Sequence, residues 1–194
     1  MKRFAILTAA AMTLATSAVA QDRTGSFYFQ VDGGVSYFNE EERNDIEVSY
    51  DLGYAFGGRI GVYATDRVRL EGDLSYANND FDKLDGVSLS SAGIEADVTV
   101  ISFGGGVFFD LTTTGATRPY LGAGAGLANK EIDANINVDT LDATDLMAFG
   151  EAGLSFGITP NLHLVPHYRL IWLDEYADDA QLVQWIRLGL RFGQ

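Results

Sequence analysis

Apolar and polar side chains alternate with a period of two along most of the chain beyond residue 20. Successive side chains of a β-strand point to opposite faces of the sheet, so this alternation predicts strands with one apolar and one polar face. The clearest case is segment 68–76, where Val68, Leu70, Leu74 and Tyr76 alternate with Arg69, Glu71, Asp73 and Ser75. The pattern therefore predicts an all-β chain.

Seven further segments repeat the alternation, which gives eight predicted strands. Their apolar rows are, in chain order, Phe27, Phe29, Val31, Val35 and Tyr37; Tyr54, Phe56, Ile60 and Val62; Ile101, Phe103, Val107 and Phe109; Leu121, Ala123, Ala125 and Leu127; Ala148, Ala152, Leu154, Phe156 and Ile158; Leu162, Leu164, Pro166, Tyr168 and Leu170; and Ile186, Leu188, Leu190 and Phe192. We expect consecutive strands to pair antiparallel in an up-and-down order.

The connections between these segments alternate in length. Long polar stretches occupy residues 39–49, 78–96, 129–145 and 173–183, and shorter connections lie at 65–67, 111–118 and 159–161. The two three-residue turns continue the apolar row on the same face, from Ala64 to Val68 and from Ile158 to Leu162. Tight turns at one end and long loops at the other are typical of an eight-stranded antiparallel transmembrane β-barrel with short periplasmic turns and four long extracellular loops.

The first twenty residues have the form of an export signal. Lys2 and Arg3 precede an apolar run over 4–14, and Ala18-Val19-Ala20 supplies the small residues of a cleavage site. We predict a signal peptide at 1–20 and a β-barrel domain at 21–194. No later apolar run reaches the roughly 20 residues of a spanning helix, so any membrane crossing must use strands.

A soluble lipocalin-like barrel is the alternative, because it also alternates but turns its apolar face inward. The lumen of eight strands holds little more than their own side chains, and the apolar rows are too bulky to fit there. We therefore predict that these rows face lipid. Aromatic residues are expected at both membrane interfaces. The predicted set is Trp172, Tyr168, Tyr76, Tyr50, Tyr54 and Trp185 at the long-loop ends and Phe27, Phe29, Phe109, Tyr120 and Phe192 at the short-turn ends.

Composition excludes several function classes. The 194 residues include no Cys, which removes thiol nucleophiles, disulfides and Cys-ligated metals. The net charge of −14 argues against nucleic-acid binding. Much of the acid lies in the long loops: Glu40, Glu41, Glu42, Asp45 and Glu47; Asp80, Asp82, Asp85 and Glu95; Glu131, Asp133, Asp139, Asp142 and Asp145; and Asp174, Glu175, Asp178 and Asp179. These carboxylates either solvate the loops or capture divalent cations near lipopolysaccharide phosphates.

The polar faces carry charges of both signs. Arginines 59, 69, 169, 187 and 191 share these faces with Asp32, Glu71, Asp73 and Glu151. Buried charges are costly unless they are paired, so we predict a salt-bridged plug that fills the lumen. The alternative is a narrow ion path gated by the breaking of one pair.

Two histidines raise a catalytic alternative. His163 and His167 are predicted to point inward near Glu151 and Ser155, a grouping that could form a hydrolase site. Neither histidine lies in a His-x-Ser arrangement, so we favour a hydrogen-bonded filling role. The glycines of 104–106 and 122–126 lack the setting of a dinucleotide loop and are expected to make room for bulky lumen side chains. We assign no catalytic, cofactor-binding or metal-ligating residue.

Several segments resemble pieces of the eight-stranded outer-membrane barrels of the OmpA/OmpX and Opa/NspA type. They are Arg118–Gly126, Ile158–Leu162, Tyr168–Arg169 and Leu188–Phe192, and the resemblance extends from Ser26 to Phe192. Such barrels commonly end in Phe, whereas Gly193 and Gln194 follow Phe192 here.

The resemblance implies a non-enzymatic monomer of the cell outer membrane, without cofactor, that contacts lipid and lipopolysaccharide. It further implies a role in envelope structure and in surface interaction, including adhesion, through the acidic loops. A lipid A-modifying hydrolase and a narrow porin-like channel remain the alternatives.

Overall fold

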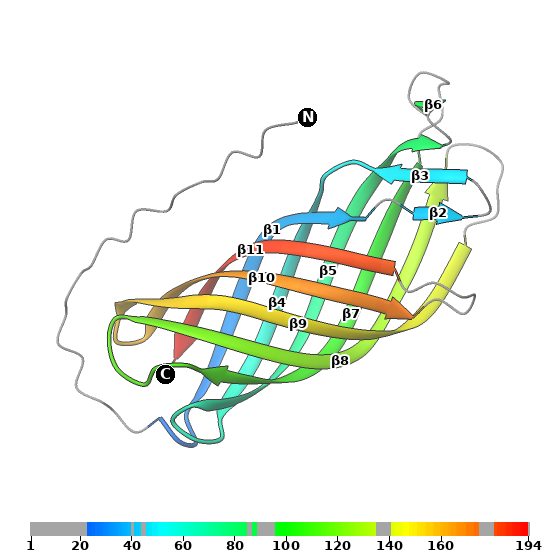
Figure 1. Cartoon of the computed structure of the whole chain (residues 1–194). Coiled ribbons are helices and arrows are strands. Elements are labelled where there is room, and N and C mark those ends of the chain that lie inside the picture. Colours follow the sequence, from blue (N-terminus) through cyan, green and yellow to red (C-terminus); the bar gives the residue numbers. More distant parts are fainter. Residues whose placement is uncertain are drawn as a thin grey trace.

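The chain forms a closed antiparallel barrel (Figure 1). The structure, a computed structural model, describes residues 23–39, 41–43, 46–84, 87–88, 96–134, 141–174 and 181–193. The eight barrel strands are β1 (Phe27–Phe38), β4 (Gly53–Tyr63), β5 (Val68–Leu84), β7 (Ala96–Asp110), β8 (Thr117–Ala134), β9 (Leu141–Thr159), β10 (Leu162–Asp174) and β11 (Gln181–Gly193). The described residues include no helix long and apolar enough to cross a membrane.

Each barrel strand pairs with the next in the sequence, and β1 pairs with β11 to close the ring. Closure satisfies the backbone groups that an open edge would leave unpaired in lipid. At the seam, the rings of Phe29 and Phe192 stack with their centroids 4.8 Å apart. There are also three short strands, β2 (Glu41–Arg43), β3 (Ile46–Tyr50) and β6 (Val87–Ser88). β3 and β6 pair with the last residues of β5, and β2 pairs with β3.

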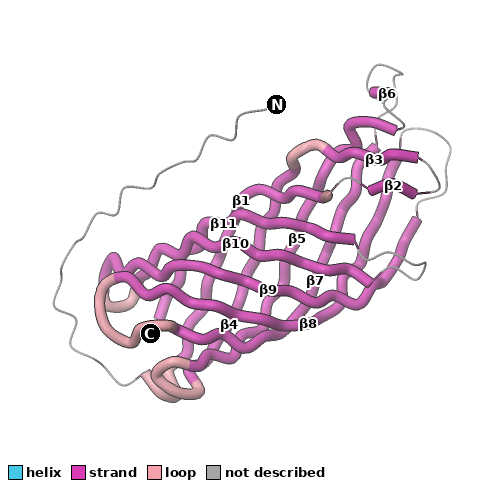
Figure 2. The backbone as a smooth tube through the Cα atoms, in the orientation of Figure 1, coloured by secondary structure: helices cyan, strands magenta, loops and turns pink. Residues whose placement is uncertain are grey.

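The short connections lie together at one end of the barrel (Figure 2). They are residues 64–67, 111–116 and 160–161, and we call this the short-turn end. The three predicted short connections are confirmed at this end. Gly115 in the second connection has a φ of +95°, a left-handed conformation that glycine adopts without strain.

The predicted long connections are wrong in extent. The strands continue through 78–84, 96, 129–134, 141–145, 173–174 and 181–183, all of which were expected to be loop. Cross-strand contacts here are polar: the Asn78 side chain donates to Asp97 Oδ2 at 2.7 Å and to Thr99 Oγ1 at 3.0 Å. In these strand ends the outer face is polar and the inner face is mainly apolar, with Val98 and Val100 buried in the lumen. The polarity of the two faces is therefore reversed relative to the lipid-facing part, and the pattern of an apolar outer row ends before the sheet does.

The apolar rows point outward, as predicted. On β5, Leu70 and Leu74 are exposed, whereas Arg69, Glu71 and Asp73 are buried in the lumen. The other strands repeat this division, with Phe29, Phe56, Phe103, Leu121, Leu154 and Leu188 among the exposed side chains. A large apolar surface around a closed ring is the arrangement that a lipid environment stabilises.

Three aromatic predictions are wrong. Trp185 and Tyr120, expected at the membrane interfaces, are each 1% exposed and lie inside the barrel. The ring of Tyr50 packs against Phe38 and Phe81, with centroids 5.2 and 4.9 Å apart. The prediction relied on how far along its strand each aromatic residue lies. The face is instead decided by the alternation of side chains, and Trp185 is two residues from Arg187, so both point inward.

The lipid-facing assignment predicts a depth-dependent cost of introducing charge. Leu74 lies at mid-strand opposite Gly58 and Phe103, and Ile158 lies at the short-turn end of β9. The two side chains are equally exposed, at 58% and 57%. We expect Leu74→Arg to lower the free energy of unfolding in lipid vesicles by about 2–4 kcal/mol and Ile158→Arg by at most about 1 kcal/mol. Equal effects in urea titrations would contradict a hydrocarbon layer around mid-strand.

Candidate functional site

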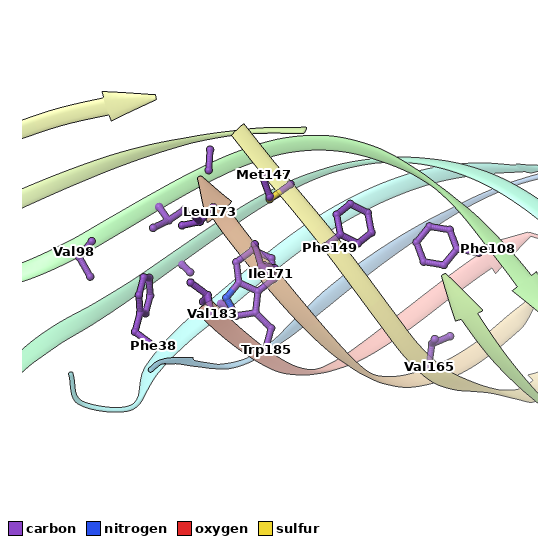
Figure 3. Packing of buried hydrophobic residues seen from close by; sticks show 14 of the residues in the cluster. Phe38, Val98, Phe108, Met147, Phe149, Val165, Ile171, Leu173, Val183 and Trp185 are labelled. Atoms are coloured by element: carbon purple, nitrogen blue, oxygen red, sulfur yellow. The ribbon is translucent and has the colours of Figure 1, made fainter. Parts of the chain in front are cut away.

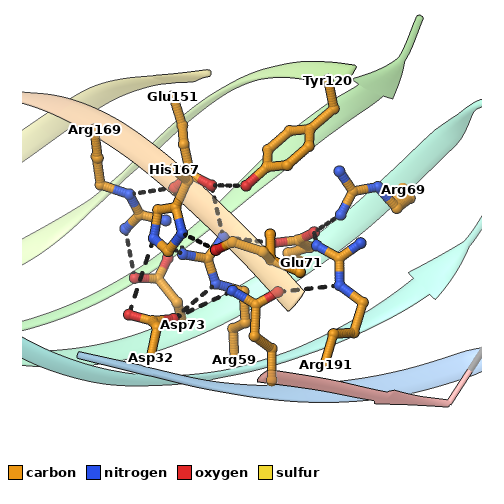
Figure 4. Close-up of polar contacts among 12 residues, drawn as sticks. Asp32, Arg59, Arg69, Glu71, Asp73, Tyr120, Glu151, His167, Arg169 and Arg191 are labelled. Atoms are coloured by element: carbon orange, nitrogen blue, oxygen red, sulfur yellow. Dashed lines mark hydrogen bonds and ion pairs between the residues drawn. The ribbon is translucent and has the colours of Figure 1, made fainter. Parts of the chain in front are cut away.

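A network of buried ion pairs occupies the lumen (Figure 4). Arg59 on β4 is at its centre. Its guanidinium lies 2.9 Å from Glu151 on β9, 3.1 Å from Glu71 on β5 and 3.5 Å from Asp32 on β1. One arginine thus neutralises carboxylates from three other strands, which ties opposite walls of the barrel together.

The remaining predicted lumen charges extend this network. Arg169 on β10 lies 2.7 Å from both Glu151 and Asp73, and Arg187 on β11 lies 2.8 Å from Asp32. Glu71 also pairs with Arg69 and, at 3.8 Å, with Arg191. All nine charged residues predicted to form a plug are therefore brought together as ion pairs.

Several members of the network were missed. Tyr28 and Tyr120 donate hydrogen bonds to Glu71 and Glu151, and Gln30 accepts one from Arg191 Nε at 3.0 Å. Asp110 pairs with Arg69 at 3.0 Å and with Arg23 at 3.2 Å. The alternation along the first strand places Tyr28 and Gln30 on the same face as Asp32, so the sequence could have identified them. Arg23 precedes the first strand, where no alternation indicates the direction of its side chain.

The inward glycines make room for these side chains, as predicted. A Cβ atom at Gly122 would lie 2.1 Å from the Phe108 ring, and one at Gly124 would lie 2.4 Å from Phe149. At Gly57 it would lie 2.7 Å from the Arg187 guanidinium that pairs with Asp32. Glycine is therefore required where a strand faces a bulky lumen group. The glycines of 104–106 and 122–126 lie within strands β7 and β8, which is not the setting of a dinucleotide-binding loop.

The two histidines lie in different parts of the lumen. His167 Nε2 faces Arg59 at 3.1 Å and its Nδ1 faces the carbonyl of Val165 at 3.1 Å. His163 Nε2 lies 2.6 Å from Arg118 Nη2. Ser155 is buried near them, but within the described ranges no hydrogen bond joins it to either histidine. The geometry thus does not form the nucleophile–base pair that hydrolysis requires.

The half of the lumen nearer the long loops is mainly apolar (Figure 3). Its members include Phe38, Val98, Val100, Met147, Ile171, Leu173, Val183 and Trp185. Trp185 also donates from its indole nitrogen to Ser36 Oγ at 3.1 Å. The sequence predicted a polar lumen throughout, and this holds only for the half nearer the short turns. Beyond the ion network, apolar side chains fill most of the lumen, and the buried polar groups there, such as Asn79 and Asp145, are fewer.

Most of the acidic loop residues lie outside the described residues or have side chains that are not described. Among those described, Asp80, Asp133 and Asp174 are exposed, Glu131 is half-buried and Asp145 is buried. The parts of the chain with described side chains contain no group of three or more His, Asp or Glu residues placed to hold a metal ion.

The chain resembles known proteins over nearly its whole length. Residues 6–192 match the family model described as outer membrane protein beta-barrel domain. Neisserial surface protein A is 20% identical with a TM-score of 0.64, and the match covers 87% of this chain and 98% of that one. No curated protein matches.

Two other solved structures share the fold. Ail, the attachment invasion locus protein of Yersinia pestis, in complex with the heparin analogue sucrose octasulfate, is 17% identical with a TM-score of 0.57 over 87% of this chain and 99% of that one. OprG from Pseudomonas aeruginosa is 13% identical with a TM-score of 0.58 over 90% and 99%.

The position of Arg59 predicts a large stability loss on its removal. Arg59→Met leaves three buried carboxylates without their shared partner, and we expect the free energy of unfolding to fall by about 3–5 kcal/mol. Arg67→Met is the control, because Arg67 is exposed in the turn at 64–67, and its effect should stay within about 0.5 kcal/mol. Urea unfolding in lipid vesicles, followed by tryptophan fluorescence, compares the two. A small effect of Arg59→Met would mean that the network contributes little.

Proposed function

Because the chain belongs to the outer membrane protein β-barrel domain family, we propose that it is a non-conducting, non-enzymatic monomer that anchors acidic loops at the cell surface. It reaches the outer membrane after removal of a signal peptide at 1–20, with its short-turn end toward the periplasm. The role is then structural support of the envelope and interaction with surface partners.

The observation that carries this proposal is that two layers of side chains, one of ion pairs and one mainly apolar, fill the lumen. Arg59 and its carboxylate partners cross the half nearer the short turns, and Trp185, Ile171 and Phe38 pack across the other half. An ion entering such a lumen would have to break buried pairs and then lose its hydration in an apolar layer. Both layers therefore favour an anchor over a channel.

The contacts of His167 support a non-enzymatic role. Both ring nitrogens of His167 are engaged, by Arg59 and by the Val165 carbonyl. An imidazole held in this way has no free nitrogen to take a proton from a hydroxyl nucleophile. The presence of His167 in the lumen is therefore explained by its packing and hydrogen bonds, without a catalytic role.

The lipid-facing rows would contact the acyl chains of outer-membrane lipid and lipopolysaccharide. Carboxylates in the four acidic loops would then lie near lipopolysaccharide phosphates, where Mg²⁺ or Ca²⁺ can bridge like charges. This part of the proposal rests on loop composition, with Glu40, Glu41, Glu42, Asp45 and Glu47 in the first loop alone.

Loop charge also suggests what kind of surface partner fits. The structure of Ail holds a heparin analogue, a polyanion. The present loops are rich in carboxylates and the whole chain carries −14, so a polyanion would be repelled. We propose a partner with a positively charged surface, for which complementary charge speeds association and confers specificity.

The first prediction from this proposal concerns conductance. We expect the folded protein, identified by heat-modifiable gel migration, to give no stable unitary steps in planar bilayers. Trp185→Ala should remain closed as well, because the ion network beneath it is unchanged. Stable steps from the native protein would instead favour the narrow-channel alternative.

A second prediction concerns loop charge. A lysine-rich probe peptide should bind the protein in neutral detergent and dissociate as salt rises, because the attraction is screened, whereas heparin should not bind. Replacement of Glu40, Glu41 and Glu42 by Gln should weaken peptide binding. Arg67→Gln, at the other end of the barrel, is the matched control and should leave it unchanged. Heparin binding by the native protein would contradict a cation-selective surface.

A further inference from the structure

Several hydrogen-bond donors at the short-turn end have no acceptor among the described residues. They are Arg118 Nε, Arg191 Nη2 and His163 Nδ1, all buried atoms. The side chains of Arg191 and His163 are themselves almost completely buried, at 2% and 5% exposure. A buried donor without an acceptor costs about 1–3 kcal/mol, and more when the group is charged. Guanidinium nitrogens of the central network also lack an acceptor, but each of those arginines is paired with a carboxylate. Arg118 differs from them, because among the described residues its guanidinium contacts His163 and no carboxylate, and this points to a missing anionic partner.

Strand register places these three groups on one arc of the lumen wall. His163 on β10 is directly opposite Arg191 on β11, and it also pairs with Gly157 on β9. Arg118 on β8 is opposite Ser155 on the same β9 strand. The side chain of Arg118 reaches across β9 to His163, where the two nitrogens are 2.6 Å apart. The arc thus runs over four consecutive strands at one level.

The contact between Arg118 and His163 fixes the role of the imidazole. A guanidinium can only donate, so His163 Nε2 must accept from Arg118. A neutral imidazole that accepts at Nε2 carries its proton on Nδ1, which then is a donor. The three unsatisfied groups are consequently all donors, and two belong to guanidinium ions. Only an anion or another acceptor-rich group complements such a set.

The acidic groups of this end are engaged elsewhere. Asp110 is held between Arg69 and Arg23, and Asp66 accepts from the Arg23 backbone nitrogen at 3.1 Å. The Arg23 guanidinium also lies 4.3 Å from the Tyr63 ring centroid. Arg23 therefore covers the side of the mouth formed by β4, β5 and β7. On the β8–β11 side, Arg118 donates its side-chain hydrogen bond to the imidazole of His163 and not to a carboxylate.

Access to the arc is from the short-turn end. Arg118 is half-buried, whereas the groups beyond it are buried, so it stands between solvent and the lumen. Ser155, on the same arc, adds a hydroxyl that can donate a further hydrogen bond. An oxyanion with several acceptor atoms matches a forked guanidinium, a second guanidinium and an N–H group.

We propose that Arg118, Arg191 and His163 form a binding site for a phosphate-type oxyanion at the short-turn mouth of the barrel. The ligand would be free phosphate or the phosphate of a lipid headgroup at the adjoining membrane surface, because both present the same acceptor oxygens. Arg191 links the site to the central ion network, because its Nε donates to Gln30 and its Nη2 lies 3.8 Å from Glu71. The acidic loops follow the opposite ends of the strands.

Phosphate binding by the folded protein in a maltoside detergent, which carries no phosphate, tests the proposal by calorimetric titration at constant ionic strength. We expect one site, and we expect Arg118→Gln to weaken it by about tenfold or more, the loss of a charged hydrogen bond. Arg67→Gln removes the same charge from an exposed position at the same end and should leave the affinity unchanged. Absence of binding by the native protein, or equal loss in both variants, would overturn the site.

Chemical protection tests the native chain without any substitution. Phosphate should slow the modification of Arg118 by phenylglyoxal at least fivefold and leave Arg67 unaffected, as read by mass spectrometry of peptides. Short-chain phosphatidylglycerol below its micellar concentration identifies the source: protection by this lipid as well assigns the site to a headgroup, and protection by inorganic phosphate alone assigns it to the free anion. Protection of Arg118 by neither compound would overturn the proposal.

Discussion

Strand register is the constraint on which the rest of this structure depends. A slip of one residue would turn every lipid-facing side chain into the lumen and every lumen charge into lipid. The register is held from both sides of the wall. Outside, rows such as Leu70 and Leu74 favour hydrocarbon; inside, Arg59 reaches its carboxylates only if β1, β4, β5 and β9 are aligned. A slip in register is therefore unfavourable on both faces of the sheet.

The ion network also explains the composition of the wall. Charged side chains are long, and eight strands enclose little space, so their neighbours must be small. Gly57 leaves room for the Arg187–Asp32 pair, and Gly153 leaves room for Tyr120, which donates to Glu151. Buried pairs are weak sources of stability but are costly to break singly. Their main effect here is to select one arrangement of the strands.

Much of this was predictable from the sequence, for a physical reason. The lipid-facing rows and the lumen charges differ in polarity and alternate strictly, so the alternation alone assigns Leu74 and Asp73 to opposite faces. The assignment of faces from polarity fails where apolar residues point inward. Trp185 and Phe38 face an apolar part of the lumen, where polarity no longer separates inside from outside. Strand ends beyond the membrane were missed for the converse reason, since Asn78 and Asp97 are polar neighbours on an outer surface in water.

The two tryptophans provide the most direct test of which face meets lipid. Trp172 is 41% exposed on the outer face, whereas Trp185 is 1% exposed inside the lumen. Because the chain has only these two, Trp185→Phe and Trp172→Phe each leave a single reporter. In vesicles of brominated lipids, the fluorescence of Trp172 should be strongly quenched and that of Trp185 nearly unaffected. Equal quenching of both, or quenching of Trp185 alone, would contradict the outward orientation of the apolar rows.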